Sequence, residues 1–419
     1  MNRSLPTAAL AVAMGLSLAA CQRDDAATSD TAAAPADAAS QSADQSPGAA
    51  TDLEQLAERI VTQSAAVRDG DVVVITGRPH DAELMENIAV HAARVGAQPM
   101  ILYSSDRLAK RLFFDVPAEY DSRPDELGMQ MAGMADVFIS LGNVTSESLF
   151  EGADPERLAA RGKAGAGVGQ EMMKNNVRRV EIGNNLYPTA WRAERFAMDM
   201  DALSKMFWDG VNLDYSTLQT RGEEVKAALA GGDEVHVTHP NGTDLRFRIG
   251  GRPVLVSDGV ISADDMKQGG AAVSVYLPAG EVYTTPVAGS AEGKIVDTGT
   301  WFRGKPVEGL TLTVEGGKVT AMSGSGPGYA DMQAAYDAVD DERKNLFAFF
   351  DLGINPNIAL PADSKAGNWV QAGTVTLGTG ANDWAGGDNT VPFGSTIYLP
   401  GSTVTLDGKT IVENGTLKL

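Results

Sequence analysis

The hydrophobic pattern of this chain changes its period at Gly231-Gly232, and this change constrains the fold more than any other feature. Before these glycines, continuous apolar runs such as Asp71–Gly77 (DVVVITG) alternate with segments whose apolar residues recur at helical spacing. Strands that are apolar on both faces and separated by amphipathic helices are typical of a parallel sheet covered by helices on each side. The sequence therefore predicts a doubly wound parallel-sheet domain over residues 51–232.

Beyond these glycines, apolar and polar residues alternate, which is the period of a half-buried strand. Residues 310–314 follow this pattern and lead into Gly316-Gly317, a hairpin signal, and Asp407-Gly408 is a second one. One helix is expected near residues 331–344. Residues 233–419 are therefore predicted to form a mainly antiparallel, β-rich α+β domain, and the fold class of the whole chain is α/β.

Residues 1–21 resemble a bacterial lipoprotein signal. Arg3 precedes a short apolar stretch that ends at Leu18-Ala19-Ala20-Cys21, and this stretch is too short to span a bilayer as a stable helix. The resemblance implies that Cys21 is lipidated and anchors the protein to a membrane face without spanning it. Gln22 stands where an Asp would favour the inner membrane. We therefore expect a lipid-anchored protein of the bacterial cell envelope that faces the periplasm, with the outer membrane favoured.

Residues 22–50 consist of Ala, Ser, Asp, Gln, Thr, Pro and similar residues without any aromatic side chain. Such a segment cannot bury enough apolar area to offset the entropy lost on ordering, so it is predicted to be a disordered tether. Cys21 is the single cysteine of the chain. The remainder is therefore predicted to contain neither a disulfide nor a cysteine metal site.

The chain is strongly acidic, with a formal net charge of −21 at pH 7. Nucleic acids and anionic lipid headgroups are bound through basic patches, so this charge argues against both as partners. Acidity is compatible with a periplasmic domain, but by itself it does not identify a substrate.

A series of motifs follows in a fixed order along the chain. They are the opening helix before DGDVVVITG, Tyr187-Pro188-Thr189 before a helix with Met198 and Met200, HPNGTDLRFRIGGR (His239–Arg252), LPAGEVYTTP (Leu277–Pro286), FFDLGINPN (Phe349–Asn357), and GTVTLGTG followed by AGGDNT. Together they resemble the metallo-aminopeptidases of the aminopeptidase T and leucyl aminopeptidase type, from about residue 52 to the C-terminus. The resemblance implies that two divalent ions activate water to remove N-terminal residues from peptides, and it implies a homodimer.

The resemblance assigns metal ligands residue by residue. Glu281 of the GEV motif stands at the first ligand position, and Asp351 stands before GINPN, where the family usually has Glu. The family then has a histidine where this chain has Thr376, and a His-x-Asp where this chain has Gly394 and Thr396. At most two ligands of the family set, both carboxylates, are therefore expected to remain.

The missing histidines change which metal the site would prefer. Imidazole is a preferred donor for zinc and cobalt, the ions that the family resemblance implies, whereas an all-oxygen set favours Mg²⁺ or Ca²⁺. Asp383 and Asp388 of the glycine-rich loop are candidate additional oxygen ligands, although turn formation is the simpler role for loop aspartates. A site without any metal is equally compatible with the sequence. A non-haem iron dioxygenase branch of the same fold also relies on histidines here, so its chemistry is disfavoured.

The four histidines of the chain all lie upstream of this region. His91 is on the apolar stripe of a helix and His80 is at a helix entrance. His236 and His239 are three residues apart in a predicted strand, so their side chains face opposite sides and make a poor chelating pair. The Gly162–Gly169 run lacks a preceding strand and a closing Lys-Ser/Thr, which disfavours a phosphate loop.

Two functions remain open at this point. One is a membrane-anchored metallo-aminopeptidase of altered metal chemistry that acts on peptides. The other is a catalytically inactive homologue that serves as a peptide-binding or scaffolding module in the cell envelope. If the assignments are correct, the side chains of Glu281 and Asp351 must converge on one site of the C-terminal domain.

Overall fold

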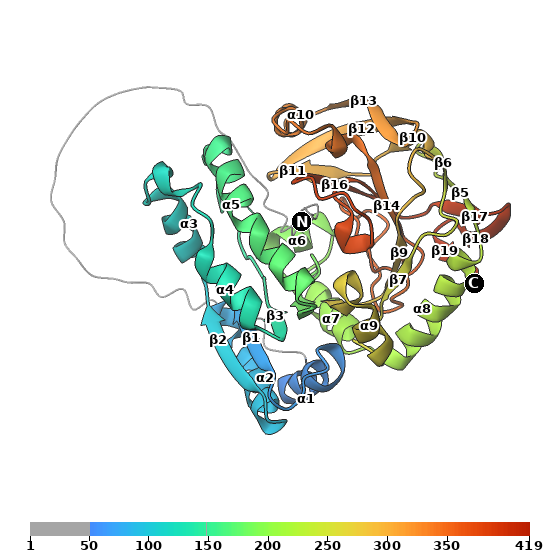
Figure 1. Ribbon diagram of the computed structural model, residues 1–419. Helices are drawn as coiled ribbons and strands as arrows, with labels where there is room; N and C mark the ends of the chain where they lie inside the picture. Colours follow the sequence, from blue (N-terminus) through green and yellow to red (C-terminus); the bar gives the residue numbers. More distant parts are fainter. Residues whose placement is uncertain (1–50, 148) are drawn as a thin grey trace, which may run out of the picture.

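The computed structural model describes residues 51–147 and 149–419 (Figure 1). The predicted signal, the tether and Cys21 lie outside the described residues. Within the described part of the chain, no helix is both long enough and apolar enough to cross a membrane. The three sheets A, B and C defined below organise the fold.

Sheet A is the parallel sheet that the first half of the sequence predicts. Its strands stand in the order β2-β1-β3-β4-β8, and all pairs are parallel. The strands are β1 (Val72–Gly77), β2 (Gln98–Tyr103), β3 (Val137–Ser140), β4 (Arg178–Ile182) and β8 (Ser274–Leu277). Strand β8 comes from beyond Gly232, so the C-terminal half of the chain supplies one edge of this sheet.

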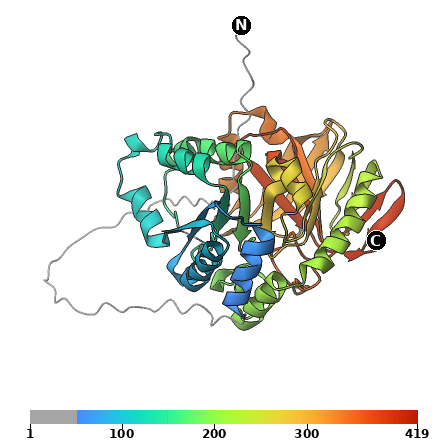
Figure 2. The ribbon, with the colours of Figure 1, turned by 60° about the horizontal axis from the view of Figure 1, so that its bottom comes forward.

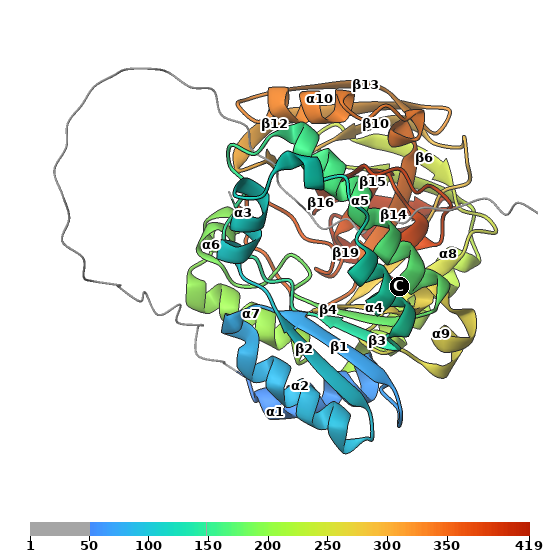
Figure 3. The same ribbon diagram turned by 60° about the vertical axis from the view of Figure 1, so that its left-hand side comes forward.

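Most helices of residues 51–231 cover the two faces of sheet A (Figure 3), whereas the last of them packs on the strands Val254–Ser257 and Glu281–Thr284. In chain order, the helices are α1 (Leu53–Arg59), α2 (Ala82–Arg94), α3 (Asp106–Phe114), α4 (Glu126–Met134), α5 (Pro155–Lys174), α6 (Ala190–Arg195), α7 (Met200–Val211) and α8 (Tyr215–Ala230). Helices α1 and α2 pack on one face with Val73, Ile75 and Ile139, whereas α4 and α5 pack on the other with Val74. This is the doubly wound arrangement that the apolar strands predict.

Polar caps explain where most of these helices begin. An N-cap side chain accepts a hydrogen bond from a backbone N–H of the first turn, which satisfies a donor that has no intrahelical partner. The residues are Asp52, Ser105, Asp125, Asp154, Thr189, Asp199 and Asp214. The Gly162–Gly169 run lies inside α5, so it forms no loop that could hold a phosphate.

Sheet B is antiparallel and has nine strands in the order β11-β12-β10-β6-β5-β17-β18-β19, with β13 beside β12. The strands are β5 (Glu234–Thr238), β6 (Asp244–Arg248), β10 (Glu292–Val296), β11 (Thr300–Phe302), β12 (Lys305–Glu315), β13 (Lys318–Ser325), β17 (Thr403–Leu406), β18 (Lys409–Glu413) and β19 (Thr416–Leu417). The hairpins predicted at Gly316-Gly317 and Asp407-Gly408 are confirmed as the β12–β13 and β17–β18 turns.

Sheet C is an antiparallel sheet of five strands in the order β16-β15-β14-β9-β7. They are β7 (Val254–Ser257), β9 (Glu281–Thr284), β14 (Phe347–Gly353), β15 (Val375–Gly380) and β16 (Gly394–Leu399). Every residue of β9, β14 and β15 is buried. The C-terminal sheets lie beside sheet A (Figures 1 and 2), and β9 follows β8 after only three residues, so sheet C begins at the carboxyl edge of sheet A.

The helix predicted for residues 331–344 is shorter than expected. Helix α10 spans Tyr329–Asp337, and a separate 3-10 segment, η5, spans Glu342–Asn345. Acidic residues are unfavourable at a helix C-terminus because the last carbonyls carry partial negative charge. Asp341 instead accepts a hydrogen bond from the backbone N–H of Arg343 and caps η5. The other helical elements of this half are α9 (Ala263–Gln268), η4 (Gly270–Val273) and η6 (Asp383–Ala385).

Candidate functional site

Glu281 and Asp351 lie on neighbouring strands of sheet C, with their side chains on the same face. Glu281 is directly opposite Gly353 in the β9–β14 pair, and Asp351 is two residues before Gly353. Opposite residues of an antiparallel pair share a face, and so do residues two apart in one strand. The register therefore brings the two carboxylates together, as the sequence assignment requires.

The positions at which the resemblance would place histidines lie on the same face. Thr376 of β15 is directly opposite Asp351, and Tyr398 of β16 is directly opposite Thr376. Gly394 and Thr396 precede Tyr398 on β16 at alternate positions, so they also point to this face. The positions that the resemblance assigns to metal ligands thus share one face of sheet C, and Thr376, Gly394 and Thr396 among them carry no side chain that binds zinc well.

Burial and mutual repulsion act on the two carboxyl groups. Asp351 is 0 % exposed and Glu281 is 4 % exposed. Burial raises the pKa of Glu281 to about 7, although the side-chain amide of Asn184 lowers it by donating to Oε1 over 2.6 Å. Burial also raises the pKa of Asp351 well above its ordinary value, and the charge of Glu281 raises it further. Burial and repulsion therefore favour protonation of these carboxyl groups or binding of a cation beside them.

Polar atoms without a partner mark the centre of this face. Among the residues that the structure describes, neither carboxylate oxygen of Asp351 has a hydrogen-bond partner, and neither does Oγ1 of Thr376. Both residues are 0 % exposed. Leaving a buried polar group unsatisfied costs roughly 1–3 kcal/mol, and more for a charged group, so such groups in folded proteins call for a ligand, an ion or water.

Five rings contact one another on this side of sheet C and are called the aromatic cluster below: Tyr283, Phe349, Trp369, Trp384 and Tyr398. The ring of Trp384 contacts Phe349 edge-on with centroids 4.8 Å apart, and lies 5.3 Å from Tyr283. Trp369 stands at 89° to Tyr398 and at 76° to Trp384. Tyr283 is directly opposite Asp351, and Phe349 is two residues before it, so both rings share its face of the sheet.

Two loops hold the tryptophans in place. An added Cβ at Gly353 would collide with the backbone carbonyls of Trp369 and Gln371, so glycine lets the Trp369 loop pack directly on β14. Asn389 fixes the loop that carries Trp384, because its side-chain amide donates to the carbonyl of Gly380 over 2.7 Å. The loop around Asn368–Gln371 therefore positions the ring of Trp369, and Asn389 holds the loop that carries Trp384.

The structure places the two loop aspartates differently. Asp383 of η6 is 9 % exposed, its Oδ1 has no partner, and burial raises its pKa to about 6. Burial raises the pKa of Tyr276 of β8 to about 12, and the negative charges of Glu281 and Asp383 also act to raise it. Asp388 has an exposed side chain. Asp383 is therefore buried and close enough to Tyr276 to act on it electrostatically, as Glu281 is, whereas Asp388 is exposed.

Sequence reasoning missed several residues of this site. Glu181 of β4 is accessible to solvent, yet the surrounding protein desolvates its carboxylate enough to raise its pKa, and its charge raises the pKa of Glu281. Asn184, which follows β4, holds Glu281. The sequence did contain one indication: the polar residues Arg179 and Glu181 flank Val180 in β4, and this alternation predicts that one face of the strand is not packed in the apolar core.

The histidines are engaged elsewhere. His91 is 9 % exposed on α2. His236 pairs with Asp244 over 2.7 Å, and Nε2 of His239 lies 2.9 Å from the carbonyl oxygen of Pro400. His236 lies in β5, whereas His239 follows the end of that strand at Thr238, so the two do not share a strand as the sequence predicted, and each has its own partner.

The residues present do not fit a zinc or cobalt pair. Within residues 51–147 and 149–419, no group of three or more His, Cys, Asp or Glu side chains is arranged to hold a metal ion. One oxygen of Glu281 is already held by Asn184, and the neighbouring strand offers the hydroxyl of Thr376 in place of an imidazole. Two metal ions at catalytic separation need more donors than this set supplies.

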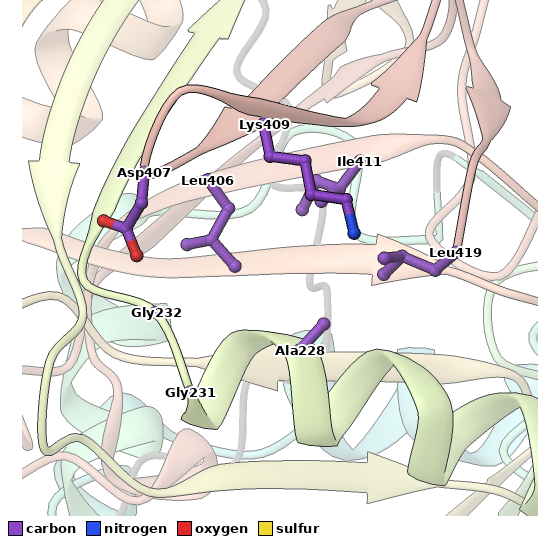
Figure 4. Close-up of a pocket in the computed structure, with 8 residues that line it drawn as sticks. All are labelled: Ala228, Gly231, Gly232, Leu406, Asp407, Lys409, Ile411 and Leu419. Atoms are coloured by element: carbon purple, nitrogen blue, oxygen red, sulfur yellow. The ribbon is translucent and has the colours of Figure 1, made fainter.

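A separate pocket of about 280 Å³ lies between the end of α8 and the β17–β18 hairpin (Figure 4). Its lining is mostly apolar and includes Ala228, Leu406, Ile411 and Leu419. None of the predicted site residues contributes to it. This pocket is therefore distinct from the carboxylate site of sheet C.

Comparison with known proteins places the fold. Wild-type AmpT from Thermus thermophilus has a TM-score of 0.67 and 17 % identity, covering 88 % of this chain and 99 % of that one. The 2,5-dihydroxypyridine dioxygenase from Pseudomonas putida KT2440 has a TM-score of 0.56 and 16 % identity, covering 87 % and 96 %. No curated protein sequence matches this chain. Residues 49–329 match the thermophilic metalloprotease (M29) family, which covers more than half of the sequence, and the chain belongs to that family.

Proposed function

We propose that this protein is a peptide-binding member of the M29 family whose site no longer supports dimetal aminopeptidase chemistry. The observation that carries the proposal is the row Asp351–Thr376–Tyr398. The family's histidine position holds a threonine there, and both oxygens of Asp351 lack partners. Family membership supports peptides as the ligand class, and the donor set argues against efficient hydrolysis.

A second candidate function rests on the same unpartnered oxygens. Asp351 and Glu281 could bind one hard cation, because carboxylate and hydroxyl oxygens are the donors that Mg²⁺ and Ca²⁺ prefer. Such an ion would polarise a peptide carbonyl, and the protein would be a slow, cation-dependent aminopeptidase. The donor set favours Mg²⁺ or Ca²⁺ over Zn²⁺ or Co²⁺ for this alternative.

One experiment separates the two functions. The purified protein is assayed for hydrolysis of leucyl and other aminoacyl anilides with added Zn²⁺, Co²⁺, Mn²⁺, Mg²⁺ or Ca²⁺, and peptide binding is measured in parallel in EDTA. We expect binding without turnover. Metal-dependent turnover that Glu281→Gln and Asp351→Asn both abolish would establish the enzyme and refute the binding module. Absence of both turnover and binding would refute the proposal as well.

We also propose that the protein acts at the surface of the bacterial cell envelope. The support is the lipoprotein-like sequence Leu18-Ala19-Ala20-Cys21 and the tether composition of residues 22–50. Cys21→Ser should move the protein from the membrane fraction to the soluble fraction, and labelled palmitate should no longer be incorporated. An unchanged membrane fraction would contradict lipid anchoring. The homodimer that the family resemblance implies is tested by sedimentation of the purified protein.

A further inference from the structure

We propose that the aromatic cluster and the buried carboxylates of sheet C bind an organic ammonium group, which takes the place of the family's metal ions. The inference deepens the proposed function, because it names the chemical group of the ligand that this site recognises. The proposed ligand is a primary amine that carries an apolar or aromatic substituent. It is either a free amine or the N-terminal residue of a peptide.

The acceptors match the donors of an ammonium group. A primary ammonium has three N–H donors and no acceptor. Asp351 offers two unpartnered oxygens, and Thr376, directly opposite, offers a third. Because all three atoms are buried on one face of sheet C, a single ammonium can satisfy groups that the protein itself leaves unsatisfied.

The rings add the second feature of an ammonium site. Cations are attracted to the faces of Trp and Tyr, and aromatic cages that bind alkylammonium ligands place several rings at steep angles. Here Trp369 stands at 76° to Trp384 and at 89° to Tyr398. These three side chains are half-buried, so the cluster reaches the protein surface. Tyr283 and Phe349 are buried and form the floor.

The charges near the cluster favour a cation. Glu281, Asp351 and Asp383 are carboxylates, and Arg179 of β4 is the opposing cation. The guanidinium of Arg179 donates to Oγ of Ser274 over 2.6 Å, so it is held at the strand pair β4–β8. Among the described residues, no guanidinium or ammonium group contacts the oxygens of Asp351, so its charge is not neutralised by an ion pair.

The rings also select between kinds of cation. Mg²⁺ and Ca²⁺ need six or more oxygen ligands and keep bound water, which indole and phenyl faces do not replace. An alkylammonium pairs with a few oxygens and packs its carbon atoms against rings. If the cluster served packing alone, a carboxylate beneath it would only cost stability, since burying an unpaired charge is unfavourable. An ammonium ligand accounts for the rings and the carboxylate together.

Binding of phenethylamine to the purified full chain tests the inference. The titration is followed by tryptophan fluorescence and by calorimetry, in phosphate buffer with EDTA at pH 7. The matched control ligand is 2-phenylethanol, which has the same ring and chain without the charge. We expect the amine to bind at least about ten-fold more tightly than the alcohol, a difference of roughly 1.4 kcal/mol. Equal affinity, or no binding of the amine, would overturn the inference.

Variants locate the site. Asp351→Asn keeps the shape and removes the charge, and Trp384→Phe keeps a ring but removes the indole. Each should weaken amine binding, by about ten-fold for Asp351→Asn and roughly three-fold or more for Trp384→Phe. Trp301→Phe, outside the cluster, should leave it unchanged. Circular dichroism and thermal unfolding establish that each variant is folded. Unchanged affinity in folded Asp351→Asn would refute the site.

Peptides separate this inference from the proposed function. One peptide that begins with Phe is compared with its N-acetylated form, which has no ammonium. Binding of the free peptide alone supports both proposals. Equal binding of both forms refutes ammonium recognition but leaves peptide binding standing. Binding of phenethylamine without either peptide supports the ammonium site and refutes the peptide-binding function.

Discussion

The side-chain amide of Asn184 donates a hydrogen bond to Oε1 of Glu281 over 2.6 Å, and it donates to the carbonyl of Pro278 over 2.9 Å. Asn184 follows the fourth strand of sheet A, whereas Glu281 begins a strand of sheet C. One amide therefore fixes the carboxylate where the parallel and antiparallel sheets meet. Among the described residues, the bond to Oε1 is the only hydrogen bond to the carboxylate of Glu281 or Asp351.

Asn184→Ala should destabilise the protein more than Asn185→Ala. Both residues have left-handed backbone, with φ of 38° and 57°, so both variants introduce similar backbone strain. Asn185 is exposed, whereas Asn184 is buried against Glu281. The excess loss in the free energy of unfolding should be about 1–3 kcal/mol, since a buried acceptor loses its donor. Urea unfolding of the two variants measures it, and equal losses would mean that the bond is dispensable.

The buried acid pair should make the ligand-free protein less stable as pH rises. The pKa of Glu281 is raised from 4.5 to about 7, and that of Asp351 is raised well above its ordinary value. Between pH 4.5 and about 7 the folded state therefore holds protons that the unfolded state has lost, so the free energy of unfolding falls as pH increases.

The measurement compares wild type with the Glu281→Gln/Asp351→Asn double variant by urea unfolding from pH 4.5 to 8, in phosphate with EDTA. The wild type should lose stability relative to the variant with rising pH, on the order of a few kcal/mol across the range. Added phenethylamine should reduce that loss, because a bound cation stabilises the ionised pair. A difference that does not depend on pH would contradict the pKa shifts.

The sequence was sufficient for the fold wherever periodicity is local. The buried strand at Asp71–Gly77, the alternation in sheet B and the two glycine hairpins all depend on residues a few positions apart. The pairing of β8 with β4 joins Val275 to Val180, and no local pattern indicates a contact across that separation. The end of α10 depends on acidic residues at its C-terminus, which a count of apolar positions ignores.

The site was only partly predictable for a related reason. Motif order placed Glu281, Asp351 and Thr376, and the register brings them to one face. The aromatic cluster was missed because its rings come from β9, β14, β16 and two loops, and each ring alone is an ordinary core residue. Asn184 and Glu181 were missed because they belong to the parallel sheet, where no motif of the family pointed.

Gly353→Ala should move the loop that carries Trp369. A Cβ at this position would collide with the carbonyl oxygens of Gln371 and Trp369, whereas a Cβ at Gly394 would meet Thr379 at an ordinary 3.8 Å. Gly353→Ala should therefore lower the free energy of unfolding by about 1–3 kcal/mol and weaken phenethylamine binding. Gly394→Ala is the matched control and should do neither. If Gly353→Ala bound the amine as well as wild type, Trp369 would not belong to the site.

Thr376→His should give the site zinc affinity, because it places an imidazole directly opposite Asp351 on the face that also carries Glu281. Three donors that include an imidazole suit Zn²⁺ better than two carboxylates do, so affinity should rise by roughly ten-fold or more, about 1.4 kcal/mol. Ser395→His is the control, since residue 395 alternates with Thr396 and points to the other face of β16.

Competition with a fluorescent chelator measures the affinity, and thermal unfolding reports whether each variant is folded and whether zinc stabilises it. If folded Thr376→His bound zinc no better than Ser395→His, Thr376 would not occupy a former ligand position, and the correspondence with the family's metal site would fail at that residue.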